Sequence, residues 1–424
     1  MNAKELKNHI ENGALDAYAG IYADVGEQKK RYIEAIDKFA SIFGGERDIY
    51  ILSVPGRSEL LGNHTDHNAG KVLAGAIDRD IIAVASPCTD NKVNLLSEGY
   101  PKDTVDLALA DNPDNFANFT SASLIAGVAD GLSKKGYKVG GFDAYCTSDV
   151  LKGSGISSSA AYEVMIGNIF NHLYNSGKIE NTEIAKISQY AENVFFGKPS
   201  GLMDQMACAV GGFVYIDFEN AASPVIEPIS FSLRKAGYEL CIVNTGGNHA
   251  DLNEDYASVP LEMKAVAALF GKAQLRGLTE GDIVAKAQKI RCELGDRALM
   301  RALHFIREND RVEKGRCALV RGDMTAFFDA VDASGTSSFK YLQNVYTTKN
   351  IGEQGLSLAL CLTDGLEGGA VGASRVHGGG FAGTIQAYVK QEFVDEYVSL
   401  MDSVFGEGSV MRLNVRPLGA IKVF

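Results

Sequence analysis

The segment Gly153-Ser-Gly-Ile-Ser-Ser-Ser-Ala-Ala161 decides the fold class of this chain. It follows a strand-like run at 142–147 and precedes apolar residues at helical spacing from 160 to 174, so we expect it at a loop-to-helix junction. Glycines allow close backbone approach, and the unpaired amides of a helix N-terminus favour an anion. Serine hydroxyls can add hydrogen bonds or a metal ligand. The segment therefore indicates a phosphate-binding loop, although a serine-capped loop without function has a similar composition.

The composition is that of an acidic globular protein. The chain has 424 residues, which favours two domains, and its formal net charge is −12. This charge disfavours nucleic acid and anionic membranes as partners, so a phosphate group needs a local pocket. The seven cysteines show no zinc-site spacing, and we find no signal peptide and no apolar run long enough to cross a bilayer. We expect a cytoplasmic protein.

A second segment, Pro55-Gly-Arg-Ser-Glu-Leu-Leu-Gly-Asn-His-Thr-Asp-His-Asn-Ala-Gly70, is dense in polar side chains. It separates a strand predicted at 48–54, which Pro55-Gly56 is expected to stop, from another predicted at 72–85. Convergent polar groups of this kind suit a polyhydroxylated ligand. Two plainer interpretations stay open, namely half of a metal site at 64–67 and a solvated turn.

A third segment, Gly197-Lys-Pro-Ser-Gly-Leu-Met-Asp-Gln205, places an aspartate in a predicted loop between apolar residues. A partly buried carboxylate needs a cationic partner, and Arg57 would serve. Near the C-terminus, Val376-His-Gly-Gly-Gly-Phe-Ala-Gly383 precedes a strand predicted at 384–389. Three consecutive glycines indicate either a tight bend or a loop close to a ligand.

In this order and spacing, the segments resemble the motifs of the GHMP kinase superfamily, from about Val54 to Val389. Gly-Asn-His-Thr-Asp-His-Asn-x-Gly and Ser-Gly-Leu-Met-Asp-Gln resemble the galactokinase branch in particular. The resemblance implies an α+β fold with two domains, which we place at 1–215 and 216–424, and an active site in the interdomain cleft. It also implies an ATP- and Mg²⁺-dependent kinase that phosphorylates the anomeric hydroxyl of galactose.

The resemblance further implies roles for individual residues. Asp204 matches the catalytic aspartate, and Arg57 matches the arginine that pairs with it. The residues implied to bind the sugar are Asn63, His64, Asp66, Gly201 and Tyr256. Those implied to wrap the phosphates of ATP are Gly153, Ser154, Gly155, Ile156, Ser157, Ser158, Ser159 and Ala160, and Gly378 to Gly383 would close the site. The implied Mg²⁺ ligands are Ser158 or Ser159, together with Glu192.

Several departures from the galactokinase pattern bear on the substrate. Asn63 stands where galactokinases usually have Glu, His67 where Tyr is usual, and Arg57-Ser-Glu59 replaces Arg-Val-Asn. Position 63 is implied to face C6 of the sugar, so a uronic acid such as galacturonate is a second candidate substrate. If galactose is the substrate, Asn63→Glu is expected to preserve its phosphorylation.

Two further questions stay open at this point. A non-catalytic regulator that binds galactose and ATP is an alternative to an enzyme, but the complete serine motif favours the enzyme. For the oligomeric state we expect a monomer and leave a weak homo-oligomer open.

Overall fold

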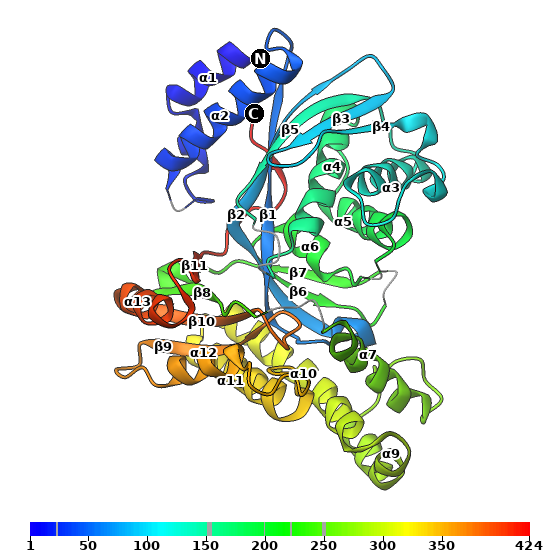
Figure 1. Ribbon diagram of the computed structural model, residues 1–424, viewed down its shortest axis with the longest axis vertical. Coiled ribbons are helices and arrows are strands. Elements are labelled where there is room, and N and C mark those ends of the chain that lie inside the picture. Colours follow the sequence, from blue (N-terminus) through cyan, green and yellow to red (C-terminus); the bar gives the residue numbers. More distant parts are fainter. Residues whose placement is uncertain (23, 151–154, 199, 221–222, 248–251) are drawn as a thin grey trace. The chain divides into compact units, whose positions relative to one another are not determined.

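The structure is a computed structural model that describes residues 1–22, 24–150, 155–198, 200–220, 223–247 and 252–424. The chain forms two compact units, each containing helices and strands (Figure 1). Unit 1 comprises 1–57, 76–212 and 416–424, and unit 2 comprises 58–75 and 213–415. The boundary expected between 215 and 216 lies close to the junction at 212 and 213. Residues 58–75 belong to unit 2 and residues 416–424 to unit 1, which the sequence did not indicate. The single domain boundary between 215 and 216 therefore stays a prediction.

Unit 1 combines a sheet with helices on both of its faces. Its helices are α1 (Ala3–Glu11), α2 (Val25–Phe43), α3 (Ser121–Lys134), α4 (Ser158–Tyr174), α5 (Asn181–Tyr190), which a π-helical turn (Ala191–Phe196) continues, and α6 (Met203–Val210). Its strands are β3 (Lys92–Ser97), β4 (Asp103–Asp106), β5 (Phe142–Ser148), β12 (Ile421–Lys422) and the unit 1 parts of β1 (Tyr50–Leu61) and β2 (Lys71–Pro87).

The strand order of this sheet is β12-β1-β2-β5-β3-β4, with β5 antiparallel to β2 and parallel to β3. In Figure 1, α1 and α2 lie on one side of these strands and α3 to α6 on the other. Because alternate residues of a strand face opposite sides, Ile82 and Val84 of β2 share one face, where they pack against Ile36 and Phe39 of α2. The sheet therefore has an apolar core beneath the N-terminal helices.

A buried ion cluster joins three separate stretches of unit 1. Asp80 of β2 is fully buried, and its carboxylate lies 2.6 Å from Arg31 Nη1 and 3.2 Å from Arg416 Nη1. Tyr22 Oη donates to Asp80 Oδ2 at 2.6 Å. Burial raises the pKa of Asp80, but the two guanidinium groups outweigh it, so the pKa lies below its ordinary value. Removal of one partner from such a cluster is expected to be strongly destabilising.

Strand β1 continues through Pro55-Gly56, where the sequence predicted its end. β12 pairs with β1 at residues 52–53, and further along the same edge the N–H of Arg57 donates to the carbonyl oxygen of Ile156 at 3.1 Å. The proline nitrogen lies between these two pairings and carries no hydrogen, so it leaves no donor unpaired. The adjacent glycine is needed because a Cβ there would lie 2.7 Å from the oxygen of Ile156. The uninterrupted strand thus positions Arg57.

Unit 2 contains a four-stranded antiparallel sheet of order β11-β8-β10-β9. These strands are β8 (Tyr238–Asn244), β9 (Val371–His377), β10 (Thr384–Lys390) and β11 (Val410–Leu413). Two further strands, β6 (Phe213–Asp217) and β7 (Val225–Ile229), extend the β2 ladder at 71–75. The helices are α7 (Asn253–Ala268), α8 (Glu280–Ala285), α9 (Ala287–Leu294), α10 (Asp296–Arg321), α11 (Met324–Ser337), which a π-helical turn (Ser338–Leu342) continues, α12 (Gly355–Asp364) and α13 (Val394–Phe405).

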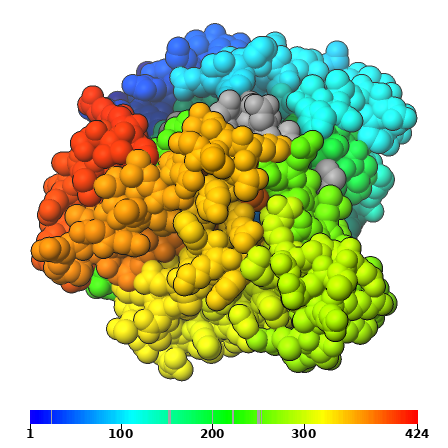
Figure 2. Space-filling view, turned by 60° about the horizontal axis from the view of Figure 1, so that its bottom comes forward, coloured from blue at the N-terminus to red at the C-terminus, as the bar shows by residue number. Residues whose placement is uncertain are grey.

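The long helix α10 organises unit 2. It packs against α7, α8, α9 and α11, and α11 in turn packs against β9. Figure 2 shows the same order on the surface, where yellow segments lie between the yellow-green helices and the orange part of the chain. In the described part of the chain, no helix combines the length and apolar character needed to span a membrane.

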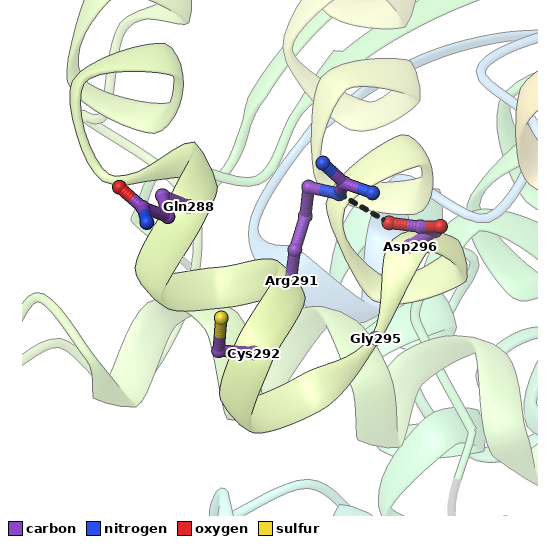
Figure 3. Close-up of a pocket in the computed structure, with 5 residues that line it drawn as sticks. All are labelled: Gln288, Arg291, Cys292, Gly295 and Asp296. Carbon is purple, nitrogen blue, oxygen red and sulfur yellow. Dashed lines mark hydrogen bonds and ion pairs between the residues drawn. The ribbon is translucent and has the colours of Figure 1, made fainter.

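A surface hollow lies at the junction of α9 and α10 (Figure 3). Its lining residues are Gln288, Arg291, Cys292, Gly295 and Asp296. Arg291 Nε donates to Asp296 Oδ1 at 2.5 Å, but both side chains are more than half exposed, so this ion pair contributes little to stability. The hollow contains none of the residues singled out by the sequence.

Candidate active site

The N-terminus of α4 forms the first part of the candidate site. Ser157 precedes the helix with φ of 60°, and its hydroxyl donates to Asp204 rather than capping the helix. Among the described residues, the first amides of α4 therefore have no side-chain cap. Such amides attract an anion, and the helix dipole adds to the attraction. This geometry suits a phosphate group.

The predicted phosphate-binding residues differ in what they can present to a ligand. Ile156 and Ala160 are buried, so their side chains belong to the core and only their backbone can face a nucleotide. The predicted residues that the structure describes are Gly155, Ile156, Ser157, Ser158, Ser159 and Ala160. Gly153 and Ser154 lie outside the described residues.

Asp204 lies in the first turn of α6, not in a loop as the sequence suggested. The helix begins at Met203 because that residue and Met206 bury their side chains on one face, and a carboxylate in the first turn is favoured by the helix dipole. Arg57 Nε donates to Asp204 Oδ1 at 2.7 Å and Nη2 donates to Oδ2 at 2.6 Å. The third nitrogen, Nη1, donates to the carbonyl oxygen of Gly155 at 2.5 Å. The expected ion pair is thus bidentate, and Arg57 also bonds to the segment that was predicted to bind phosphate.

The environment of Asp204 keeps its carboxyl ionised. Burial raises the pKa, but the charge and hydrogen bonds of Arg57 and the hydroxyl of Ser157 outweigh burial, so the pKa lies below its ordinary value. The Asp204 side chain is 31% exposed, whereas that of Arg57 is 10% exposed. A carboxylate that is ionised, fixed and partly exposed can bind a substrate hydroxyl.

Glu192 lies in the π-helical turn after α5, and its carboxylate accepts hydrogen bonds from four donors. Oε1 accepts from Lys198 Nζ at 2.8 Å and from Ser159 Oγ at 3.5 Å. Oε2 accepts from Ser200 Oγ at 2.5 Å and from Gln205 Nε2 at 2.7 Å. Two serines, Ser158 and Ser159, were predicted as metal ligands. Among the described hydrogen bonds, Ser159 is the one that donates to Glu192.

This arrangement fits a magnesium ion. Mg²⁺ binds through oxygen atoms, typically one or two carboxylates with substrate phosphates and water. Ser159 Oγ and Glu192 Oε1 supply two such oxygens at the N-terminus of α4. The described residues contain no group of three or more His, Cys, Asp or Glu side chains that could hold a metal by themselves. A site completed by nucleotide phosphates is consistent with both observations.

Glu163 is a residue of this cluster that sequence reasoning missed. It lies on α4, is fully buried, and accepts from Gln205 Nε2 at 3.0 Å, the same amide that donates to Glu192. Burial raises its pKa well above the ordinary value, and the charge of Glu192 raises it further. Burial and the charge of Glu192 thus favour the protonated form of Glu163, and the shared amide of Gln205 links the two carboxyl groups. Its only signal in the sequence is an acid within the otherwise apolar spacing of a helix.

In unit 2, the polar segment after β1 is held by α10. Glu308, also missed by sequence reasoning, accepts from the backbone N–H groups of Gly62 at 3.0 Å and Asn63 at 3.4 Å. Arg311 Nε donates to its other oxygen at 2.6 Å. Burial raises the pKa of Glu308, but Arg311 and the other donors lower it to about 2. Gly62 has φ of 103°, a conformation that glycine adopts without strain. These contacts fix where the segment begins.

The side chain of Asn63 is fully buried and makes four hydrogen bonds. Its amide nitrogen donates to Glu59 Oε1 at 3.1 Å and to the carbonyl oxygen of Gly378 at 2.7 Å. Its amide oxygen accepts from Ser338 Oγ at 3.2 Å and from Asn344 Nδ2 at 2.7 Å. Asn344 is a third residue that sequence reasoning missed, because only the fold brings it here.

His64 and Tyr256 meet at the glycine-rich segment. His64 Nε2 lies 2.9 Å from the carbonyl oxygen of Gly379, so Nε2 carries the hydrogen and Nδ1 is an acceptor. Burial lowers the pKa of His64 to about 3, which keeps the ring neutral. The Tyr256 ring lies 5.2 Å from the His64 ring, and a Cβ on Gly379 would collide with it. The glycine at position 379 thus allows the backbone to pack closely against Tyr256.

Asp66 and Gly201, the two remaining residues predicted to bind the sugar, lie in different units. Asp66 begins a short 3-10 turn (Asp66–Asn68); its Oδ1 accepts from the backbone N–H of His67 at 3.0 Å and lies 3.7 Å from His67 Nε2. Gly201 belongs to unit 1, shortly before α6. The predicted residues therefore form two groups, one around Arg57 and Asp204 in unit 1 and one around the segment 62–70 in unit 2.

Comparisons with known proteins agree on one family. The galactokinase galactose-binding signature matches residues 37–87, and the GHMP kinases N terminal domain matches 123–212. Galactokinase from Streptomyces coelicolor is 31% identical, with 87% of this chain and 92% of that protein covered. Galactokinase from Lactococcus lactis subsp. cremoris is 29% identical, covering 88% and 90%.

Solved structures share the fold. The Lactococcus lactis galactokinase complexed with galactose has a TM-score of 0.77 at 24% identity, covering 91% of this chain and 98% of that one. The mevalonate kinase of Methanococcus jannaschii has a TM-score of 0.61 at 16% identity, covering 88% and 100%. The fold is therefore that of the GHMP kinases, and the identity to curated relatives over most of both chains shows that this chain belongs to the galactokinase family.

Proposed function

We propose that the protein transfers the γ-phosphoryl group of ATP to the anomeric hydroxyl of galactose. Membership of the galactokinase family makes it a phosphotransferase acting on a sugar hydroxyl, with ATP as the donor. The observation that carries the proposal is the ionised Asp204, held by Arg57 beside the uncapped N-terminus of α4. Phosphoryl transfer depends mainly on positioning and charge stabilisation, and this arrangement provides both.

Asp204 orients the attacking hydroxyl and takes up its proton as the new O–P bond forms. Because the pKa of Asp204 is low, the carboxylate is a weak base and its main contribution is to orient the hydroxyl. Arg57 fixes the carboxylate through two hydrogen bonds and places positive charge where negative charge develops. The amides of α4 hold phosphate oxygens without any proton transfer.

Ser159 and Glu192 would hold Mg²⁺ in this proposal. When bound, the ion neutralises charge on the phosphates and helps to orient them. In this structure Lys198 Nζ lies 2.8 Å from Glu192 Oε1 and neutralises its charge. The Lys198 side chain is 52% exposed, so it can turn away when a cation binds. Glu163 and Gln205 keep the Glu192 carboxylate in place.

On the sugar side we propose that His64, Asp66 and Tyr256 contact hydroxyl groups. His64 Nδ1 is an acceptor in a neutral ring, and the Asp66 side chain is 16% exposed. The exposed part of Tyr256, 43% of the residue, offers an amphipathic ring beside them. We also propose a cytoplasmic monomer; the scattered cysteines favour a reducing compartment, and light scattering would test the oligomeric state.

The test is a coupled ATP-consumption assay with purified protein, Mg²⁺ and galactose or galacturonate, with the product identified by ³¹P NMR. We expect a sugar 1-phosphate from galactose and loss of turnover in Asp204→Asn. If no galactose-configured sugar is phosphorylated while sugar and ATP still bind, the protein is a non-catalytic regulator and the proposal fails.

A further inference from the structure

Asn63 has no hydrogen-bonding capacity left for a ligand. An asparagine amide offers two donors and an oxygen that accepts about two bonds. In this protein both donors are used by Glu59 and Gly378, and the oxygen already accepts from two side chains. Binding a sugar hydroxyl here would break an existing bond in a fully buried position. We infer that Asn63 positions its neighbours rather than contacting the sugar.

The carboxylate beside it has the opposite property. Glu59 Oε1 accepts from Arg375 Nη2 at 2.8 Å and from Asn63 Nδ2 at 3.1 Å. No described residue donates a hydrogen bond to Oε2. This oxygen is nevertheless not fully buried, so it is in contact with solvent. The Glu59 side chain as a whole is only 8% exposed. One oxygen is therefore anchored and the other is available.

The anchor is rigid. Arg375 is fully buried, and its remaining nitrogens donate to the carbonyl oxygens of Val376 at 3.0 Å and Leu60 at 3.1 Å. A guanidinium held at three points fixes the carboxylate that it binds, and the Asn63 amide fixes the same oxygen from another direction. Glu59 Oε2 is consequently a preorganised acceptor.

The electrostatic field at this position disfavours a further negative charge. Burial raises the pKa of Glu59, Arg375 lowers it, and the charge of Asp66 raises it, so the net pKa lies above its ordinary value. Asp66 belongs to the same stretch of unit 2 as Glu59 and Asn63, and its side chain is 16% exposed, so its charge is also present in this polar segment. A sugar carboxylate brought there would meet two like charges and one guanidinium that is already paired.

We propose that Glu59 is a specificity-determining residue whose Oε2 accepts a hydrogen bond from a hydroxyl of a neutral galactose-configured sugar, and that Glu59 and Asp66 together exclude a sugar carboxylate. This proposal rests on the proposed sugar kinase function. It changes the significance of Asn63 for the substrate, because the negative charge missing at position 63 is present four residues earlier in the chain. Galacturonate is disfavoured for the same reason.

The experiment compares wild type, Glu59→Gln and the matched control Glu239→Gln with galactose and galacturonate. Glu239 is also 8% exposed at its side chain and paired with an arginine in unit 2, but it lies on β8. Glutamine at position 59 keeps an oxygen for Arg375 and turns an NH₂ group towards the ligand. We expect about a tenfold rise in the galactose KM with a smaller change in kcat, since a charge-assisted hydrogen bond is lost. The preference for galactose over galacturonate should also fall, and the ATP KM should stay constant.

Other outcomes overturn the proposal. A galactose KM in Glu59→Gln within twofold of that in Glu239→Gln would show that Oε2 does not contact the sugar. Wild-type preference for galacturonate would refute the exclusion. Failure of the wild type to phosphorylate any sugar is a distinct result, because it refutes the kinase function on which the proposal rests. If Glu59→Gln does not fold, Glu59→Asp keeps the charge and shortens the reach, and a galactose KM unchanged from wild type would be equally contradictory.

Discussion

Replacement of Asn63 by glutamate tests the hydrogen-bond network around the polar segment. The amide nitrogen of Asn63 lies 3.1 Å from Glu59 Oε1 and 2.7 Å from the oxygen of Gly378. In Asn63→Glu, a carboxylate oxygen would replace that nitrogen and face two oxygens instead of donating to them. The sequence alone suggested that this change would be tolerated with galactose. The structure leads to a different expectation, because position 63 is fully buried and packed against another carboxylate.

The size of the effect follows from these contacts. Two unit charges about 4 Å apart repel by about 4 kcal/mol at an effective dielectric constant of about 20. Two donated hydrogen bonds are also lost, at about 1 kcal/mol each. Protonation of one carboxyl would relieve part of the repulsion, so we expect a net loss of about 4 kcal/mol in the free energy of unfolding. For a unit of this size, each kcal/mol lowers the midpoint by about 2–4 °C.

The assay is thermal unfolding of the wild type, Asn63→Glu, Glu59→Asn and the double variant at pH 7. The double variant exchanges the carboxylate and the amide, so one negative charge again faces one amide near Arg375. We expect Asn63→Glu to lower the midpoint by about 10 °C and the double variant to recover at least half of the summed loss. An Asn63→Glu midpoint within about 2 °C of the wild type, or a double variant no better than the sum of the single variants, would refute the reasoning.

Three further predictions concern the proposed chemistry. Asp204→Asn should lower kcat by about 10²–10⁴-fold and leave ATP affinity within about twofold, measured by steady-state kinetics and calorimetry; a kcat near wild type would exclude a catalytic role. Glu192→Gln should raise the Mg²⁺ concentration needed for half-maximal activity at least tenfold, by analogy with other metal-site substitutions. The control variant Glu183→Gln should not, because Glu183 of α5 pairs with Lys135 at 2.9 Å and is 22% exposed. Glu308→Gln should destabilise the protein at pH 7. Because the pKa of Glu308 is about 2 in the folded protein and 4.5 ordinarily, this difference should persist above pH 4.5 and shrink as the pH falls towards 2, and a constant difference in denaturant titrations would contradict the assignment.

The local parts of this protein were predictable from its sequence, and the long-range contacts were not. The helix after the serine-rich segment and the strand at 142–147 have clear periodicity, and the structure contains both. The pairing of Arg57 with Asp204 could be anticipated because a partly buried carboxylate needs a cation. The strand through Pro55-Gly56 was missed, since its continuation depends on what lies beside it rather than on residue propensity.

The network around Asn63 illustrates the limit more sharply. Its partners Ser338, Asn344 and Gly378 come from distant parts of the chain, and no local pattern connects them. Family resemblance identified Glu59 and Asn63 as separate departures, whereas the structure shows that the two side chains form a hydrogen bond. A pairwise contact of this kind becomes visible only once the fold is known.

The discontinuous course of unit 1 has a consequence for biosynthesis. A ribosome makes Asp80 early and Arg416 more than three hundred residues later, yet the two form one buried ion pair at 3.2 Å. Until 416–424 has left the ribosome, Asp80 lacks one guanidinium and the edge of β1 lacks β12. Unit 1 can therefore complete its folding only after residues 416–424 have been translated, and until then this edge of β1 lacks a partner strand.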